Sequence, residues 1–153
     1  MAKSHWRLQS IGFKAPGVIQ YAERKRWGII RESYFVCEYV PGQPVDDASL
    51  SLVVASLQRL YRLGYTRRDP RLRNFIIHQG EVVYIDVGVG HPWLFRRLRC
   101  YLEFVRFLNL EPKAQEFANP QLIASWSYRF ARTVEMIYRR VRSPWTRLRR
   151  SLK

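Results

Sequence analysis

Three oxygen-bearing side chains stand close together in the middle of the chain. Asp69 and Asn74 lie five residues apart at the two ends of a short loop, and Asp86 closes an apolar run. Gln79-Gly80 separates two apolar runs and predicts a tight hairpin, which would fold Asp86 back beside Asn74. The spacing therefore predicts that the three side chains converge.

These residue types suit one kind of chemistry. Mg²⁺ takes a few carboxylate or amide oxygens from a protein and keeps other positions for phosphate and water. With Asn74 and Asp86 on the metal, Asp69 is left to accept a proton from an attacking hydroxyl, which is the division of roles in phosphoryl transfer. Arg68 can orient the loop or offset negative charge. The alternative is that all three are turn and capping residues, but the apolar strand before Asp86 favours the metal.

The order of helices and strands predicted around this loop indicates an α+β fold rather than alternating βαβ units. A helix capped by Asp46 or Asp47 and stopped by Gly64 is predicted just before the loop. The other predictions are a short helix at 2–13, antiparallel strands at 17–22 and 29–40, the hairpin at 74–78 and 81–87, helices at 93–108 and 120–142, and a basic tail.

The composition fits one compact domain with an anionic partner. The 153 residues are 47% hydrophobic, which excludes disorder as the main state. The 27 Lys and Arg residues exceed the 12 Asp and Glu residues by 15, and 22 of the 27 are Arg, the cation suited to forked contacts with phosphate. Cys37 and Cys100 are too few for a disulfide framework, which favours a reducing compartment. The start of the chain has no apolar signal-peptide centre, and we expect a cytoplasmic location.

The motif R-D-x-x-x-x-N, from Arg68 to Asn74, is followed after the hairpin by Asp86-x-Gly88. This pattern resembles the catalytic loop and metal-binding turn of the protein-kinase-like fold. The strand ending in CEYVPG is similar to the hinge between the two lobes of that fold. DPxxxNFII, IDxG, AERK, EYVxG and the Arg-rich helical C-terminus together resemble the lipopolysaccharide core heptose kinases.

The resemblance implies a set of roles. ATP and Mg²⁺ would be the cofactors, with Asn74 and Asp86 holding metal and nucleotide and Asp69 the catalytic base. The backbone at Glu38 and Val40 would face adenine. The acceptor would be a heptose hydroxyl of the lipopolysaccharide inner core, at the cytoplasmic membrane face. Residues 1–40 would be a remnant of the N-terminal lobe, and residues 41–153 the C-terminal catalytic lobe.

The chain departs from a complete kinase pattern at its start. A Gly-rich phosphate loop and a strand lysine should precede the helix near residues 3–12, and neither occurs there. Because phosphoryl transfer depends on positioning and charge stabilisation, we expect this chain alone to be weakly active or inactive. Either it is the C-terminal part of a longer kinase, which we favour, or it is a shortened relative that needs a partner or is a silent scaffold. No obligate protein partner is evident.

Arginine clusters occur beside the loop and at the C-terminus. Arg71, Arg73, Arg96, Arg97 and Arg99 are either ordinary solvated charge or contacts for an acidic, phosphate-bearing acceptor. The stretch 137–153 alternates arginines with Trp and aliphatic residues, which suits an anionic membrane surface and peripheral attachment. Nucleic acid is the alternative partner for this stretch. The lack of a helix-turn-helix, zinc or RNA-stacking motif argues against it.

Overall fold

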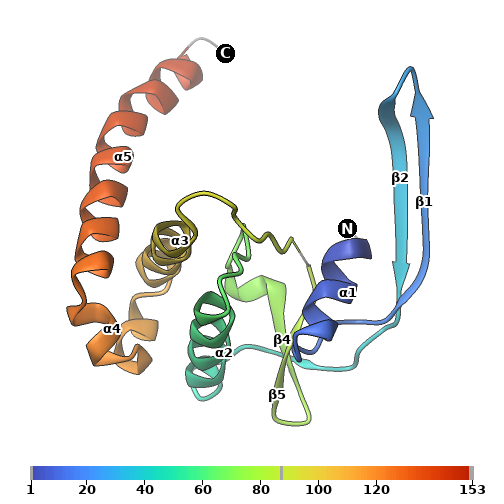
Figure 1. Ribbon diagram of the computed structural model, residues 1–153, viewed down its shortest axis with the longest axis horizontal. Helices are drawn as coiled ribbons and strands as arrows, with labels where there is room; N and C mark the ends of the chain where they lie inside the picture. Colours follow the sequence, from blue (N-terminus) through green and yellow to red (C-terminus); the bar gives the residue numbers. More distant parts are fainter. Residues whose placement is uncertain (1, 87, 152–153) are drawn as a thin grey trace.

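The computed structural model describes the backbone of residues 2–86 and 88–151 and the side chains of residues 3–86 and 88–140. The architecture is α+β, as predicted (Figure 1). A two-stranded ribbon, β1-β2, stands apart from a small sheet with strand order β3-β4-β5, and α2 packs against that sheet, with α3 and α5 beyond α2. The helices are α1 (Ala2–Ser10), α2 (Leu50–Arg62), α3 (Arg96–Leu110), α4 (Pro120–Ala124) and α5 (Trp126–Ser151), and the strands are β1 (Val18–Arg26), β2 (Ile29–Cys37), β3 (Gln43–Pro44), β4 (Phe75–His78) and β5 (Glu81–Tyr84).

The core lies between α2, the β4-β5 hairpin and α3. Leu57 of α2, Phe75 of β4 and Phe104 of α3 are buried in one apolar cluster. The Tyr84 ring lies edge-on to Phe75 at 5.0 Å, and its hydroxyl is 2.8 Å from the Ser56 hydroxyl of α2. The hairpin is therefore fixed to α2 by apolar packing and by a polar contact at its inner end.

Two predicted turns are confirmed in detail. At the end of α2, Gly64 takes φ +81°, and the N–H groups of Gly64 and Tyr65 donate to the carbonyls of Tyr61 and Leu60. This is the left-handed helix ending that glycine favours. Gln79 and Gly80 both have positive φ, 52° and 77°, as a two-residue hairpin of the mirror-image type requires.

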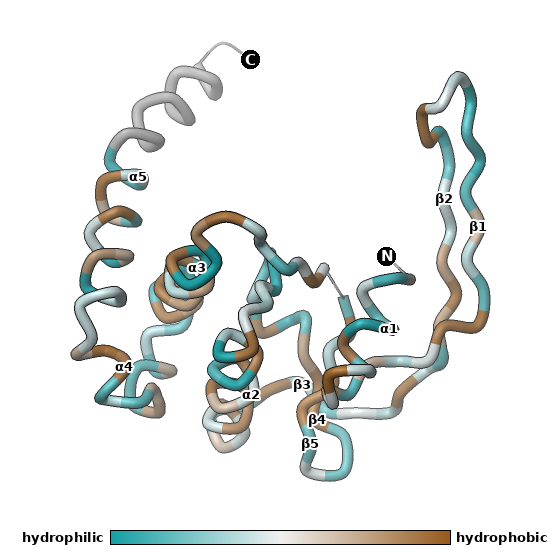
Figure 2. The backbone as a smooth tube through the Cα atoms, viewed as in Figure 1, coloured by the Kyte–Doolittle hydropathy of each residue, from teal (hydrophilic) through white to brown (hydrophobic). Residues whose placement is uncertain are grey.

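The predicted end of the first strand was wrong, because the strand lies in an exposed ribbon where charged side chains are tolerated. The charged stretch 23–28 was predicted to be a turn, but β1 continues to Arg26 and only Trp27 and Gly28 turn. Both faces of this ribbon are largely exposed, so charged side chains cost it no burial. Figure 2 shows hydrophilic residues interleaved with hydrophobic ones along it.

The helical bounds also differ from the prediction. Asp46 does not cap α2 directly. Its carboxylate accepts the N–H of Ser49 (2.9 Å) and sets the turn before the helix. The helix predicted at 93–108 begins at Arg96, because Phe95 adopts φ +52°. The helix predicted at 120–142 is two helices divided at Ser125, whose hydroxyl accepts the N–H of Tyr128 and caps α5. The backbone of α5 continues through the predicted tail to Ser151.

The start of the chain is joined to the core. Leu8 of α1 is fully buried, and Lys14 forms a parallel bridge with Val83, which adds a fourth segment beside β5. His5 is also buried, its ring 4.7 Å from Phe35 of β2 and its Nδ1 3.1 Å from the carbonyl oxygen of Pro16. The division of the chain at residue 40 stays a prediction.

His5 gives the fold a dependence on pH. Burial lowers the pKa of His5 below its ordinary value, although the contact with Pro16 opposes the shift. The unfolded chain therefore binds the proton more readily, so the free energy of unfolding should fall as pH drops below about 6.5. Urea unfolding between pH 5 and 7.5 should show this slope in the natural chain and a flatter one in His5→Gln. His78→Gln, in the residue of β4 that precedes the hairpin turn, should keep the natural slope. Equal slopes in all three proteins would show that His5 is not the group responsible.

Candidate active site

The loop 66–74 is held in place by Glu103 of α3. One carboxylate oxygen of Glu103 accepts the backbone N–H of Arg67, and the other accepts that of Arg68 at 2.9 Å. The Tyr61 hydroxyl of α2 donates to the same carboxylate at 3.1 Å. Burial raises the pKa of Glu103, and the three donors oppose that rise. Two helices and the loop therefore meet at one buried carboxylate.

Arg67 is a buried cation beneath the candidate site. It is 1% exposed, and its guanidinium lies 5.6 Å from the Phe75 ring and 5.7 Å from the Tyr84 ring. Burial lowers the pKa of Arg67, and the negative charge of Asp86 is the strongest effect that raises it. The guanidinium stays charged, because arginine does not deprotonate in proteins. It thus offsets negative charge directly under the site.

The backbone brings Asp69, Asn74 and Asp86 to one place. Asn74 is buried, and its Nδ2 donates to the carbonyl oxygen of Asp69 at 2.8 Å. The carbonyl oxygen of Asn74 in turn accepts the N–H of Ile85 at 3.1 Å, so Asp86 follows directly after a residue bonded to Asn74. The side chain of Asp86 is exposed and that of Asp69 is 47% exposed. Both carboxylates are therefore accessible from solvent.

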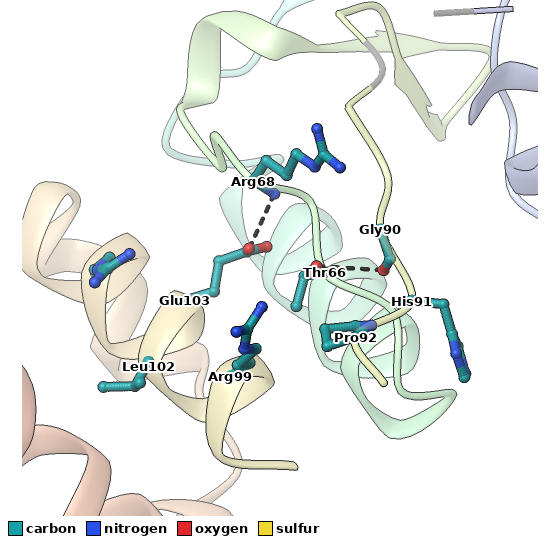
Figure 3. A pocket seen from close by; sticks show the side chains of 9 residues that line it. Thr66, Arg68, Gly90, His91, Pro92, Arg99, Leu102 and Glu103 are labelled. Carbon is teal, nitrogen blue, oxygen red and sulfur yellow. Dashed lines mark hydrogen bonds between the residues drawn. The ribbon is translucent and has the colours of Figure 1, made fainter. Parts of the chain in front are cut away.

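A second backbone contact joins the loop to the segment after Asp86. Thr66 and Gly90 exchange two backbone hydrogen bonds, of 2.8 and 2.9 Å. The Thr66 hydroxyl also donates to the Gly90 carbonyl oxygen at 3.2 Å (Figure 3). Arg68, between Thr66 and Asp69, has φ +69°, a conformation that non-glycine residues adopt rarely and at a cost of order 1 kcal/mol or more. The bond from its N–H to Glu103 holds it there.

The donor set fits a hard divalent cation. Because Nδ2 of Asn74 is committed to Asp69, its Oδ1 is the end left for a ligand. Asn74 Oδ1 and the Asp86 carboxylate are the kinds of oxygen that Mg²⁺ takes from a protein when phosphate and water fill the remaining positions. No group of three His, Cys, Asp or Glu side chains suited to a metal occurs among the described residues.

The remaining predicted residues have these positions. Arg71 makes an ion pair with Asp69, Nε to Oδ1 3.0 Å, so it is not merely solvated charge. Glu38 and Gly17 share two contacts, the Glu38 N–H donating to the Gly17 carbonyl and the Glu38 carboxylate accepting the Gly17 N–H. Val40 is half-buried in the segment between β2 and β3. The adenine contact of Glu38 and Val40 stays a prediction.

Arg67 and Glu103 were given no role from the sequence. A signal for Glu103 existed: it lies between Cys100 and Phe104 on the side of the predicted helix that carries apolar residues, where a carboxylate needs partners. Nothing in the spacing of Arg67 indicated burial. Burial raises the pKa of the Cys100 thiol to about 11, which disfavours the reactive thiolate there.

The chain resembles part of a known kinase. It is 26% identical over 101 residues, 62% of this chain, to the lipopolysaccharide core heptose(II) kinase WaaY of Escherichia coli (strain K12). The match covers 44% of that protein, so the chain spans less than half the length of the relative. No protein-family model and no solved structure matches the chain. Among the described residues, no helix is both long and apolar enough to cross a membrane.

Removing the Glu103 carboxylate should release the loop. Glu103→Ala leaves the buried N–H groups of Arg67 and Arg68 without acceptors, which should cost about 3 kcal/mol of unfolding free energy. Glu103→Gln keeps one acceptor oxygen and should lose less. Amide hydrogen exchange at residues 67 and 68 should accelerate in both variants. Glu116→Ala, in the exposed 3₁₀ turn Pro112–Phe117, is the control and should stay within about 0.5 kcal/mol of the natural chain. Unchanged exchange at residues 67 and 68 would contradict the anchoring role.

Proposed function

We propose that this chain carries the catalytic loop of a protein-kinase-like sugar kinase, which transfers the γ-phosphate of ATP to a heptose hydroxyl of the lipopolysaccharide core. One observation carries the proposal: the loop that contains Asp69 and Asn74 is bonded to the end of β5, so that Asp86 follows beside it. The partial similarity to a heptose(II) kinase supports the choice of acceptor.

The proposed roles follow from the positions of the groups. Asp69 is an accessible carboxylate on a loop whose conformation is set by Glu103, so it can accept a proton from a bound hydroxyl. Asn74 and Asp86 would hold Mg²⁺, which supplies charge stabilisation to the phosphates when bound. Arg68 and the buried Arg67 offset negative charge around the loop. The segment 38–40 would provide the adenine edge.

The ion pair of Asp69 with Arg71 belongs to this account. The Nε of Arg71 lies 3.0 Å from Oδ1 of Asp69, so the ion pair fixes the position of this carboxylate on the loop. Arg71 is exposed, so it can move away when an acceptor hydroxyl arrives. In this proposal Arg71 is a positioning residue, because it acts on the acceptor only through Asp69.

The metal assignment can be tested by nucleotide binding. Calorimetric titration of the purified chain with ATP should show affinity that depends on Mg²⁺. Asp86→Asn should weaken ATP affinity at least tenfold when Mg²⁺ is present and change it little when Mg²⁺ is absent. The reason is that Asp86 would contact the nucleotide only through the metal. Asp69→Asn should keep ATP affinity within about twofold and lower any phosphate transfer by 10²–10⁴-fold.

The matched control is Asp47→Asn, which removes an exposed carboxylate that pairs with Lys113 at 2.6 Å. It should bind ATP like the natural chain. Equal affinity of Asp86→Asn and the natural chain with Mg²⁺ would overturn the metal assignment. Absence of any Mg²⁺-dependent ATP binding would favour the alternative of a catalytically silent scaffold.

We also infer that α5 docks on an anionic membrane surface. Tyr128, Ala131 and Glu135 form the buried face of this helix, and Glu135 pairs with Arg106 of α3 at 2.8 Å. The opposite face carries Trp126, Phe130 and Ile137, which are 77%, 44% and 54% exposed and share one stripe by their spacing of four and seven residues.

Arg129 and Arg140 each follow a residue of this apolar stripe, Trp126 and Ile137, by three positions and so lie along one edge of it. Arg129, Arg132, Arg139 and Arg140 line a groove of about 600 Å³ at the junction with α3. A helix with aromatic and aliphatic side chains on one stripe and arginines beside it suits the interface of an anionic bilayer. The side chains of residues 141–153, on which the sequence-based prediction of a membrane contact also drew, lie outside the described residues.

Liposome co-sedimentation tests this contact. Vesicles with 30% phosphatidylserine should bind the chain at least fivefold better than neutral vesicles, and the difference should shrink in 0.5 M salt. Trp126→Ser with Ile137→Ser should reduce binding, whereas Leu52→Ser, an exposed leucine on α2, should not. Equal binding to both vesicle types would refute the electrostatic part. Preference for an RNA duplex over vesicles would favour the nucleic-acid alternative.

A further inference from the structure

A pocket of about 490 Å³ lies beside the candidate catalytic loop and takes in Arg68 but not Asp69. Figure 3 shows three walls: the loop with Thr66 and Arg68, the segment from Gly90 to Pro92, and α3 with Arg99 and Glu103. Arg68 and Asp69 are consecutive, so their Cα atoms are about 3.8 Å apart. The backbone at this wall of the pocket therefore leads directly to the candidate base.

The charge of the pocket is positive and largely uncompensated. The guanidinium groups of Arg68 and Arg99 make no hydrogen bond or ion pair with any side chain or backbone group that the structure describes. The third arginine of the pocket, Arg106, is paired with Glu135 at 2.8 Å. Glu103 adds no accessible negative charge, because it is 7% exposed and its oxygens are held by the loop N–H groups.

Two glycines lie beside the side chain of Arg68. A Cβ at Gly88 would be 3.7 Å from Cδ of Arg68, and a Cβ at Gly90 would be 3.6 Å from its Nε. The arginine side chain therefore extends along the Gly88–Gly90 segment, close enough that a Cβ added at either glycine would touch it at ordinary van der Waals distance.

We propose that this pocket binds an oxyanion group, phosphate or carboxylate, that the acceptor carries in addition to the hydroxyl that reacts. Two arginines from separate elements, a loop and α3, are suited to forked contacts with such a group. The placement beside Asp69 makes the site one for the acceptor rather than for the nucleotide. Calling the ligand the acceptor rests on the proposed kinase function, whereas the anion site itself does not depend on that function.

The test uses soluble probes and the whole chain. Mannose 6-phosphate, glucuronate and mannose are titrated while the side-chain Nε–Hε signals of the arginines are followed by NMR. The Arg68 and Arg99 signals should shift with a charged probe and not with mannose. The comparison of the phosphate and the carboxylate probes identifies which oxyanion is preferred. Arg99→Gln should weaken binding of the preferred probe at least fivefold, and 0.5 M salt should weaken it further.

Arg97→Gln is the matched control, because Arg97 is exposed on the same helix and does not line this pocket. It should bind the probes like the natural chain. Equal losses in Arg97→Gln and Arg99→Gln, or equal binding of mannose and its phosphate, would overturn the proposal. Mg²⁺-dependent ATP binding is measured in parallel. If ATP binds and the charged probes do not, the pocket proposal fails alone; if the probes bind at Arg99 and ATP does not, the kinase proposal fails and the anion site stands.

Discussion

The candidate site depends on one buried carboxylate. Glu103 lies in the middle of α3 and accepts hydrogen bonds from two consecutive backbone N–H groups of the loop and from a tyrosine of α2. A buried carboxylate is costly unless such partners surround it. The hydrogen-bond donors that stabilise this buried charge come from the loop and from α2. The same hydrogen bonds therefore fix the loop between α2 and α3. The positive φ of Arg68 follows from this anchoring.

The loop also contributes a buried positive charge of its own, the guanidinium of Arg67. Arg67 is buried against the rings of Phe75 and Tyr84, and Asp86 is the carboxylate that most favours its charged form. The loop is thus held by an anion from α3 and by a cation of its own that packs on the hairpin. An arrangement of this kind leaves the exposed carboxylates, Asp69 and Asp86, at the surface of a rigid support, as a site that must position reacting groups requires.

Much of the fold could be predicted from sequence because its signals are local. The periodicity of α2, the glycine that ends it and the Gln79-Gly80 turn each depend on a few neighbouring residues. The backbone contacts that bring the segments of Asp69, Asn74 and Asp86 together are consistent with that turn. The anchoring by Glu103 could not be predicted in the same way, because it joins residues 35 and 36 positions apart. The length of β1 was missed because charge was read as a turn signal, although an exposed ribbon tolerates it.

The exposed ribbon has a consequence for handling the protein. Among the described residues, β1 pairs only with β2, so the outer backbone edge of each nine-residue strand lacks a strand partner. Such edges are templates for association between chains, and Ile19, Ile29 and Tyr34 are more than half exposed on this ribbon. Arg24, Lys25 and Glu32 interrupt the apolar run and oppose stacking. Colloidal stability should therefore be lowest in concentrated, high-salt solutions, where screening removes the repulsion that keeps these edges apart.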